Sequence, residues 1–139
     1  MNKIIFLDID GVLNTTKTYE ETHGVRKIYN KLIKENNDLD LMIKLQLLEI
    51  DYNKLIILKE IINKTNAKIV ITSSWRLLRI YPLIEDYLIK FGLPIIGTTK
   101  KLKNRGEEIA DYCNENNVKN YIIIDDEVFE DFTENQKYN

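Results

Sequence analysis

Four short apolar runs recur along the chain, and segments with a helical pattern separate them. The runs predict four strands, over Ile4–Leu7, Ala67–Ile71, Leu93–Gly97 and Tyr121–Ile124. The first run, Ile4–Leu7, is apolar at consecutive positions, which is typical of a strand that is buried on both faces of a sheet. Because strands alternate with helices, the pattern predicts an α/β fold with a parallel sheet and right-handed crossovers.

Apolar residues three and four positions apart predict the helices between these strands. Helices are expected from about Asn53 to Thr65 and from Gly106 to about Asn116. Between the second and third strands, Ser73 or Ser74 can cap a helix that Pro82 interrupts. Proline suits the first position of a helix, so a new helix is predicted there, and Gly92 ends it.

Residues 15–51 form an insertion between the first strand and the helix that starts near Asn53. One predicted helix follows a break at His23-Gly24, and a second begins at Asp38 or Asp40. The insertion is too small to be an independent domain, so residues 1–139 are expected to form a single domain. Two interpretations stay open: a small cap or flap over the strand ends, or a helical hairpin that only packs on the sheet.

Composition and charge argue against several classes of protein. A chain of 139 residues with 44% hydrophobic residues can bury a core, and a net charge of −2 does not indicate a nucleic-acid or membrane-surface binder. A local basic patch remains possible around Lys100, Lys101 and Lys103. The single Cys113 excludes an internal disulfide, and the first apolar run is too short for a signal peptide or membrane span. We therefore expect a cytoplasmic protein without a membrane segment.

Polar side chains follow the predicted strands at their carboxyl ends. Asp8 and Asp10 follow the first strand, and the pairs Thr72-Ser73 and Asp125-Asp126 follow the second and fourth strands. Arg105 stands at the start of a helix. Ligands of parallel α/β sheets bind at this edge, and buried carboxylates require a cation or hydrogen-bond donors. The sequence therefore predicts an acidic, ligand-binding site there.

The motifs around these residues resemble those of the haloacid dehalogenase (HAD) superfamily, whose first motif is Asp-x-Asp-Gly-Val/Thr. The chain looks closest to the HAD domains of Swiss-army-knife RNA repair proteins. Four segments carry this resemblance: Phe6–Asn14, Ser73–Arg76, Arg105–Ile109 and Asp125-Asp126. The match covers the core, about residues 3–14, 53–76 and 93–127. It implies a three-layer Rossmann-like fold with a parallel sheet in the strand order 3-2-1-4 and a small helical cap.

The resemblance also implies a phosphatase mechanism. Asp8 would be the nucleophile that forms an aspartyl-phosphate, and Asp10 the general acid/base. A carboxylate repels a phosphate monoester unless a cation lies between them, and Mg²⁺ prefers oxygen ligands. Asp8, the backbone carbonyl of Asp10 and Asp125 would hold Mg²⁺, by analogy with the family. Asp126 would orient the metal's water ligands, or it only caps a helix.

Thr72 is the expected phosphate-binding hydroxyl, because it directly follows the second apolar run, and Ser73 is the alternative. The family usually carries lysine in its third motif, where this chain has Arg105, so Lys103 is a possible substitute. Arginine binds phosphate well because its planar guanidinium can donate two parallel hydrogen bonds.

The substrate is expected to be phosphorylated, with a nucleotide or a nucleic-acid end suggested by the RNA-repair resemblance and the three lysines. A non-catalytic phosphate- or RNA-end-binding module is the alternative from another class, and a phosphotransferase or mutase would use the same acids. Trp75 is expected in the core, and an exposed Trp75 would instead stack a base. Arg76 is expected to pair with Asp126 or to reach the substrate.

Overall fold

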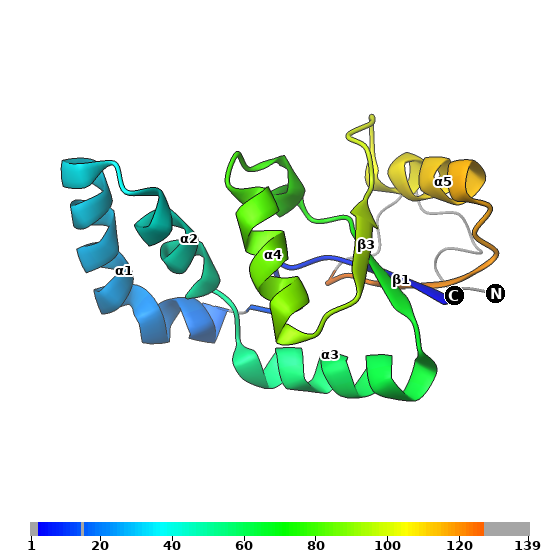
Figure 1. Ribbon diagram of the computed structural model, residues 1–139, viewed down its shortest axis with the longest axis horizontal. Coiled ribbons are helices and arrows are strands. Elements are labelled where there is room, and N and C mark those ends of the chain that lie inside the picture. The colour runs from blue at the N-terminus through cyan, green and yellow to red at the C-terminus, as the bar shows by residue number, and fades with distance from the viewer. Residues whose placement is uncertain (1–2, 15, 127–139) are drawn as a thin grey trace.

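The computed structural model describes residues 3–14 and 16–126, and in this part of the chain four strands form one sheet (Figure 1). The strands are β1 (Lys3–Leu7), β2 (Lys68–Ile71), β3 (Ile95–Thr98) and β4 (Asn120–Ile124). All neighbouring strands are parallel and lie in the order β3-β2-β1-β4. The predicted fold class and strand order are therefore confirmed.

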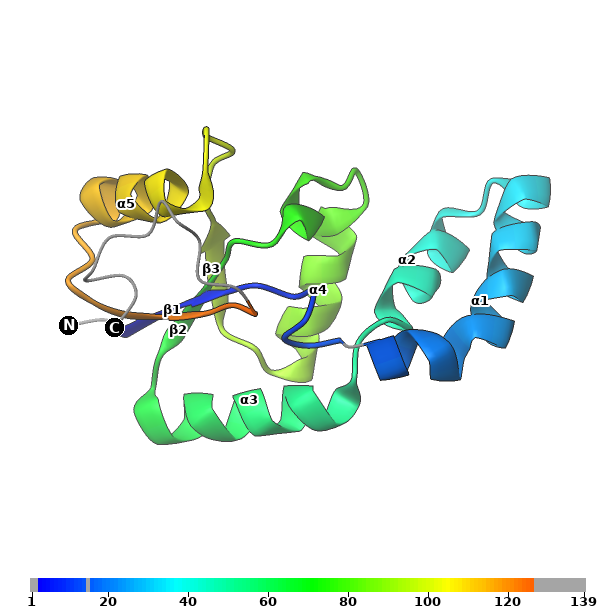
Figure 2. The same ribbon diagram turned by 180° about the vertical axis from the view of Figure 1, so that it is seen from behind.

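Helices cover both faces of this sheet (Figures 1 and 2). Helices α3 (Tyr52–Thr65) and α4 (Tyr81–Phe91) lie on one face, and α5 (Arg105–Asn116) lies on the other. The alternate side chains of β1 divide between these layers: Ile5 and Leu7 pack with α3 and α4, while Ile4 and Phe6 pack with α5. Because β1 has helices on both faces, its apolar residues run consecutively rather than alternating with polar ones.

Side-chain and backbone caps set where the core helices begin and end. Asn104 accepts a hydrogen bond from the Glu107 amide (3.0 Å) and starts α5. Pro82 lies in the first turn of α4, and Gly92 ends that helix with a left-handed φ of 118°. The predicted new helix at Pro82 is confirmed. The segment before it is a short 3₁₀ helix, η1 (Ser74–Leu77), with Ser73 as its N-cap.

The insertion consists of α1 (Thr16–Asn36) and α2 (Leu39–Leu47). Asp38 caps α2 by accepting hydrogen bonds from the amides two and three residues later, as one of the two predicted starts required. The predicted break at His23-Gly24 is wrong, because α1 continues through it. Glycine costs about 1 kcal/mol inside a helix, which lowers the stability of α1 without ending it.

Helix α2 connects the insertion to the core. It lies between α1 and α4 in both views (Figures 1 and 2), and it contacts α4. Its Ile43 is 5% exposed and belongs to the main core cluster, which is the apolar cluster that contains Ile5 and Leu7 of β1. In contrast, Ile28 of α1 is 60% exposed. The Asp51 amide donates to the Leu13 carbonyl (2.7 Å), so the two ends of the insertion meet beside the loop after β1.

Two further observations concern the chain as a whole. Among the described residues, no helix combines the length and the hydropathy that crossing a membrane requires. A short apolar cluster near the end of the sequence, Val128, Phe129 and Phe132, lies outside the described residues.

Candidate active site

The carboxyl edge of the sheet brings together the residues that follow three of its strands. The hydrogen-bond ladder continues one residue beyond β1 and β2: the Asp8 amide donates to the Ile124 carbonyl and the Thr72 amide to the Leu7 carbonyl, both at 3.0 Å. Asp8 and Thr72 thereby continue the register in which Leu7 pairs with Ile71, so they lie next to each other, and Asp125 directly follows Ile124. The structure therefore brings the residues after these three strands together at one edge of the sheet.

Arg105, the first residue of α5, contacts all three strand ends. Its Nη1 atom lies 2.7 Å from Oδ2 of Asp125, 3.4 Å from Oγ1 of Thr72 and 3.9 Å from Oδ1 of Asp8. Lys103 is exposed in the preceding loop and forms no ion pair within the described residues. The structure thus brings Arg105, and not Lys103, into contact with the acids.

Three carboxylates at this edge fit a hard divalent cation. Asp8, Asp125 and Asp126 each offer one oxygen atom, and these oxygens lie within 4.8 Å of one another. An all-oxygen, carboxylate-rich donor set is the kind that Mg²⁺ prefers. Gly11 makes room for this group: with its φ of 79°, a Cβ atom there would lie 2.6 Å from Cγ of Asp126. A residue other than glycine would therefore displace Asp126.

The side chain of Asp10 is exposed and is held separately from these three acids. Its Oδ1 atom accepts hydrogen bonds from the Trp75 indole Nε1 (3.1 Å) and from Nδ2 of Asn14 (3.0 Å). Asn14 is 3% exposed, and its Oδ1 accepts from the Gly11 amide (2.9 Å). Asp8 and Asp10 are thus two residues apart in sequence but have different surroundings.

Trp75 is 4% exposed, which confirms that it is a core residue rather than an exposed base-stacking one. The sequence did not predict that Trp75 contacts Asp10, nor that Asn14 does. Both residues lie within the segments that carry the family resemblance, which was the available signal.

The electrostatic environment of Asp8 combines burial with nearby charges of both signs. Burial raises the pKa of the Asp8 carboxyl above its usual range, and the positive charge of Arg105 opposes that change. The charges of Asp126 and Asp10 raise the pKa further. A bound divalent cation would favour the ionised form, because a nearby positive charge stabilises a carboxylate.

Thr72 and Ser73 are both fully buried, but their hydroxyl groups have different surroundings. The Thr72 hydroxyl faces Arg105, whereas Oγ of Ser73 accepts a hydrogen bond from the Trp75 amide (3.2 Å) and caps η1. Capping by Ser73 was one of the two predicted possibilities. In the basic loop, Lys100 pairs with Glu115 of α5 (2.5 Å), so part of the charge of the three lysines is neutralised.

The carboxylate partner of Arg76 is Glu108 and not Asp126, so the prediction of an Asp126 partner is wrong. Its Nη2 atom donates to Oε2 of Glu108 (2.8 Å), and both side chains are buried, at 4% and 7% exposure. Burial lowers the pKa of Arg76, and the negative charge of Glu108 opposes that change. Glu108 was missed in the sequence, where the only signal was an acid three residues after Arg105 on one helix.

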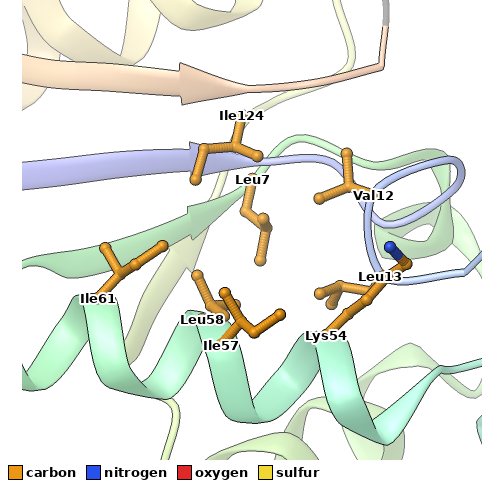
Figure 3. A pocket seen from close by; sticks show the side chains of 8 residues that line it. All are labelled: Leu7, Val12, Leu13, Lys54, Ile57, Leu58, Ile61 and Ile124. Carbon is orange, nitrogen blue, oxygen red and sulfur yellow. The ribbon is translucent and has the colours of Figure 1, made fainter.

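A hollow of about 190 Å³ lies between α3 and the ends of β1 and β4. Figure 3 shows the side chains of α3 pointing toward those of the strands and of the loop after β1. Its lining residues are Leu7, Val12, Leu13, Lys54, Ile57, Leu58, Ile61 and Ile124. None of the predicted site residues is among them, so this apolar hollow is distinct from the acidic site.

Comparison with known proteins supports the resemblance to HAD domains that the sequence motifs indicated. The family model described as "HAD domain in Swiss Army Knife RNA repair proteins" matches residues 4–138. No curated protein and no solved structure matched the chain. A HAD domain indicates a phosphatase-type function and typically uses a metal ion. The match spans nearly the whole sequence, and the chain therefore belongs to the family of HAD domains found in Swiss Army Knife RNA repair proteins.

Proposed function

We propose that the protein is a Mg²⁺-dependent phosphomonoester hydrolase that works through an aspartyl-phosphate on Asp8. One observation carries the proposal: a buried aspartate, a threonine hydroxyl and a second aspartate from three strand ends surround a single arginine, within 3.9 Å of its Nη1 atom. This arrangement provides a nucleophile beside a cation and a hydroxyl donor, as transfer of an anionic phosphoryl group requires.

Mg²⁺ would be held by Asp8 and Asp125, with Asp126 and the backbone carbonyl of Asp10 as further ligands or as partners of its water molecules. When bound, Mg²⁺ supplies positive charge that offsets the repulsion between the carboxylates and the phosphate. Thr72 and Arg105 would donate hydrogen bonds to the phosphate oxygens, with Ser73 as the alternative hydroxyl.

In the first step, a carboxylate oxygen of Asp8 bonds to phosphorus while the bond from phosphorus to the leaving oxygen breaks. Asp10 donates its proton to that oxygen. In the second step, Asp10 removes a proton from a water molecule whose oxygen attacks phosphorus, and the bond from phosphorus to Asp8 breaks. The hydrogen bonds from Trp75 and Asn14 support this role, because they fix the orientation of the Asp10 carboxyl group.

The substrate class is proposed to be a nucleotide or a polynucleotide phosphate. The RNA-repair name of the family supports this class, and so do Lys101 and Lys103, which are exposed in the loop before α5. A positively charged loop attracts the phosphates of a nucleic-acid chain. Lys100 contributes less, because Glu115 and Asp111 surround its amine.

A panel of phosphorylated oligonucleotides, free nucleotides and phosphopeptides, with and without Mg²⁺, tests the proposal. Hydrolysis should require Mg²⁺ and should be abolished in Asp8→Asn, whose side chain has nearly the same shape. Unchanged turnover in Asp8→Asn would contradict the mechanism. Tight binding without turnover would favour a non-catalytic module, and transfer of phosphate to another acceptor would favour a phosphotransferase. Equal, poor rates on all three substrate types would contradict the nucleic-acid class.

A further inference from the structure

We propose that Glu108, fixed in place by Arg76, is a positioning residue that orients Arg105 toward the phosphate. The inference rests on the proposed function, because it assigns a support to the residue proposed to bind phosphate. Neither Glu108 nor Arg76 has a role in the mechanism described above, although both are buried and charged.

Two atoms of the Arg105 guanidinium group contact carboxylates of the described residues. Nη1 donates to Asp125 (2.7 Å), and Nε lies 3.7 Å from Oε1 of Glu108. Because the guanidinium group is planar, contacts at Nε and Nη1 define the direction of the whole plane. A lysine, the usual residue of the family at this position, is a point charge and has no plane to orient. The arginine in this chain therefore needs a second contact, which Glu108 supplies.

Glu108 itself can adopt few other positions. Its Oε2 atom accepts hydrogen bonds from Nη2 of Arg76 (2.8 Å) and from the Leu102 amide (3.0 Å). The residue is 6% exposed, so water cannot replace these partners easily. With Oε2 occupied in this way, Oε1 is directed toward Arg105.

Arg76 connects this group to the strand end that carries Thr72. Its Nη1 atom donates to the carbonyls of Thr72 (2.7 Å) and Ser73 (2.9 Å), and its Nε donates to the carbonyl of Thr99 (2.9 Å). The contacts run from the end of β2 through Arg76 and Glu108 to Arg105. The proposed phosphate-binding hydroxyl and cation are thus set relative to each other by one buried network.

The test uses Glu108→Gln in the full chain, because glutamine has the same shape and keeps an oxygen that can accept hydrogen bonds. Loss of a side chain that orients a metal ligand typically lowers activity ~10- to 100-fold, and we expect a fall of similar size in kcat here. Glu115→Gln is the matched control. It removes a carboxylate from the same helix, where Glu115 is exposed and pairs with Lys100, and it should leave kcat unchanged.

Two readouts separate positioning from a purely structural role. The chain has four arginines, so the Nε–H resonance of Arg105 can be identified by its loss in Arg105→Lys. It should shift and exchange faster with water in Glu108→Gln. In the Arg105→Lys background, Glu108→Gln should lower kcat by less than about twofold, because lysine has no Nε–H for Glu108 to hold.

The same loss of kcat in both backgrounds, or an unchanged Arg105 resonance, would overturn the proposal. If Glu108→Gln does not fold, Arg76→Lys replaces it. Lysine keeps the charge, but its single ammonium nitrogen cannot reach the separate partners that Nε, Nη1 and Nη2 of Arg76 bind. It should shift the same resonance and lower kcat, and no effect on either would also overturn the inference. A wild-type protein without turnover would contradict the proposed function, whereas the resonance tests the positioning role without any substrate.

Discussion

Two arginine–glutamate pairs, one buried and one partly buried, differ mainly in the other groups that they contact. Arg76 and Glu108, at the carboxyl edge of the sheet, are 2.8 Å apart, and Arg26 and Glu49, in the insertion, are 3.0 Å apart. The edge pair binds backbone carbonyls at the ends of β2 and β3 and faces Arg105. The insertion pair instead joins α1 to the segment after α2. The chemistry of the pair is the same, so its neighbours decide its role.

The insertion pair also lies within electrostatic reach of the proposed site. Glu49 accepts hydrogen bonds from the Tyr19 hydroxyl (2.8 Å) and from Arg26 (3.0 Å), and the Arg26 guanidinium lies 4.0 Å from the centre of the Tyr19 ring. The negative charge of Asp10 acts on the pKa of both Glu49 and Tyr19. The base of the insertion therefore borders the site, while the residues proposed for the chemistry lie on the core.

The largest effect that tests this difference between the insertion and the core site is expected for Asp10→Asn, at the carboxyl edge of the sheet. Asparagine keeps an oxygen that can accept from Trp75 and Asn14, so the loop should keep its structure while the proton carrier is lost. We expect kcat to fall ~10²–10⁴-fold, the usual contribution of general acid–base catalysis. Steady-state kinetics on the best phosphorylated substrate measures the change.

The exposed Asp86 of α4 provides the control, because Asp86→Asn makes the same substitution away from the site. It should leave kcat unchanged. An Asp10→Asn protein that turns over at the wild-type rate would show that Asp10 is not the proton carrier.

The next effect concerns stability and compares two isoleucines of the insertion. Ile43 of α2 is 5% exposed and packs in the main core cluster, so Ile43→Ala should lower the free energy of unfolding by about 2–5 kcal/mol. Ile28 of α1 is 60% exposed, and Ile28→Ala should change it by less than about 0.5 kcal/mol. Urea unfolding of both variants measures this. Equal effects would mean that α2 is no more a part of the core than α1.

Local sequence signals predicted the sheet and the core helices well, because these signals act over short distances. A consecutive apolar run such as Ile4–Leu7 indicates burial on both faces, and Pro82 and Gly92 mark helix ends through their own backbone preferences. The predicted break at His23-Gly24 was wrong because one local signal was weaker than those of its neighbours. The helical preference of the neighbouring residues outweighed the cost of one exposed glycine.

The supports of the site could not be predicted in this way, because they depend on contacts between distant segments. Trp75 meets Asp10 across 65 positions of sequence, and Arg76 meets Glu108 across 32. An arginine can pair with any acid that the fold brings near it, so sequence suggested Asp126 for Arg76 when Glu108 was the partner. Residue types and motif order indicate which chemistry is present, whereas tertiary packing decides which side chain orients which.

The smallest expected effect is the pH dependence of stability that Glu49, in the insertion pair, contributes. Burial raises the pKa of Glu49, and the charge of Asp10 adds to this, while the Tyr19 hydrogen bond and Arg26 oppose it. Ionisation of Glu49 is therefore less favourable in the folded protein than in the unfolded chain. Its contribution to stability is present below the usual pKa range of glutamate and is lost as the pH rises through the raised value.

Glu49→Gln cannot ionise, so its free energy of unfolding should depend less on pH than that of the wild type. Unfolding in urea at several pH values from about 4 to 8 measures the difference, in which the common contribution of Asp8 cancels. Its kcat should stay within about twofold of the wild type, in contrast with Glu108→Gln, because Glu49 orients no residue of the proposed mechanism. Identical pH profiles would show that Glu49 is not destabilised by burial. A loss of kcat as large as that of Glu108→Gln would remove the functional distinction between the two pairs.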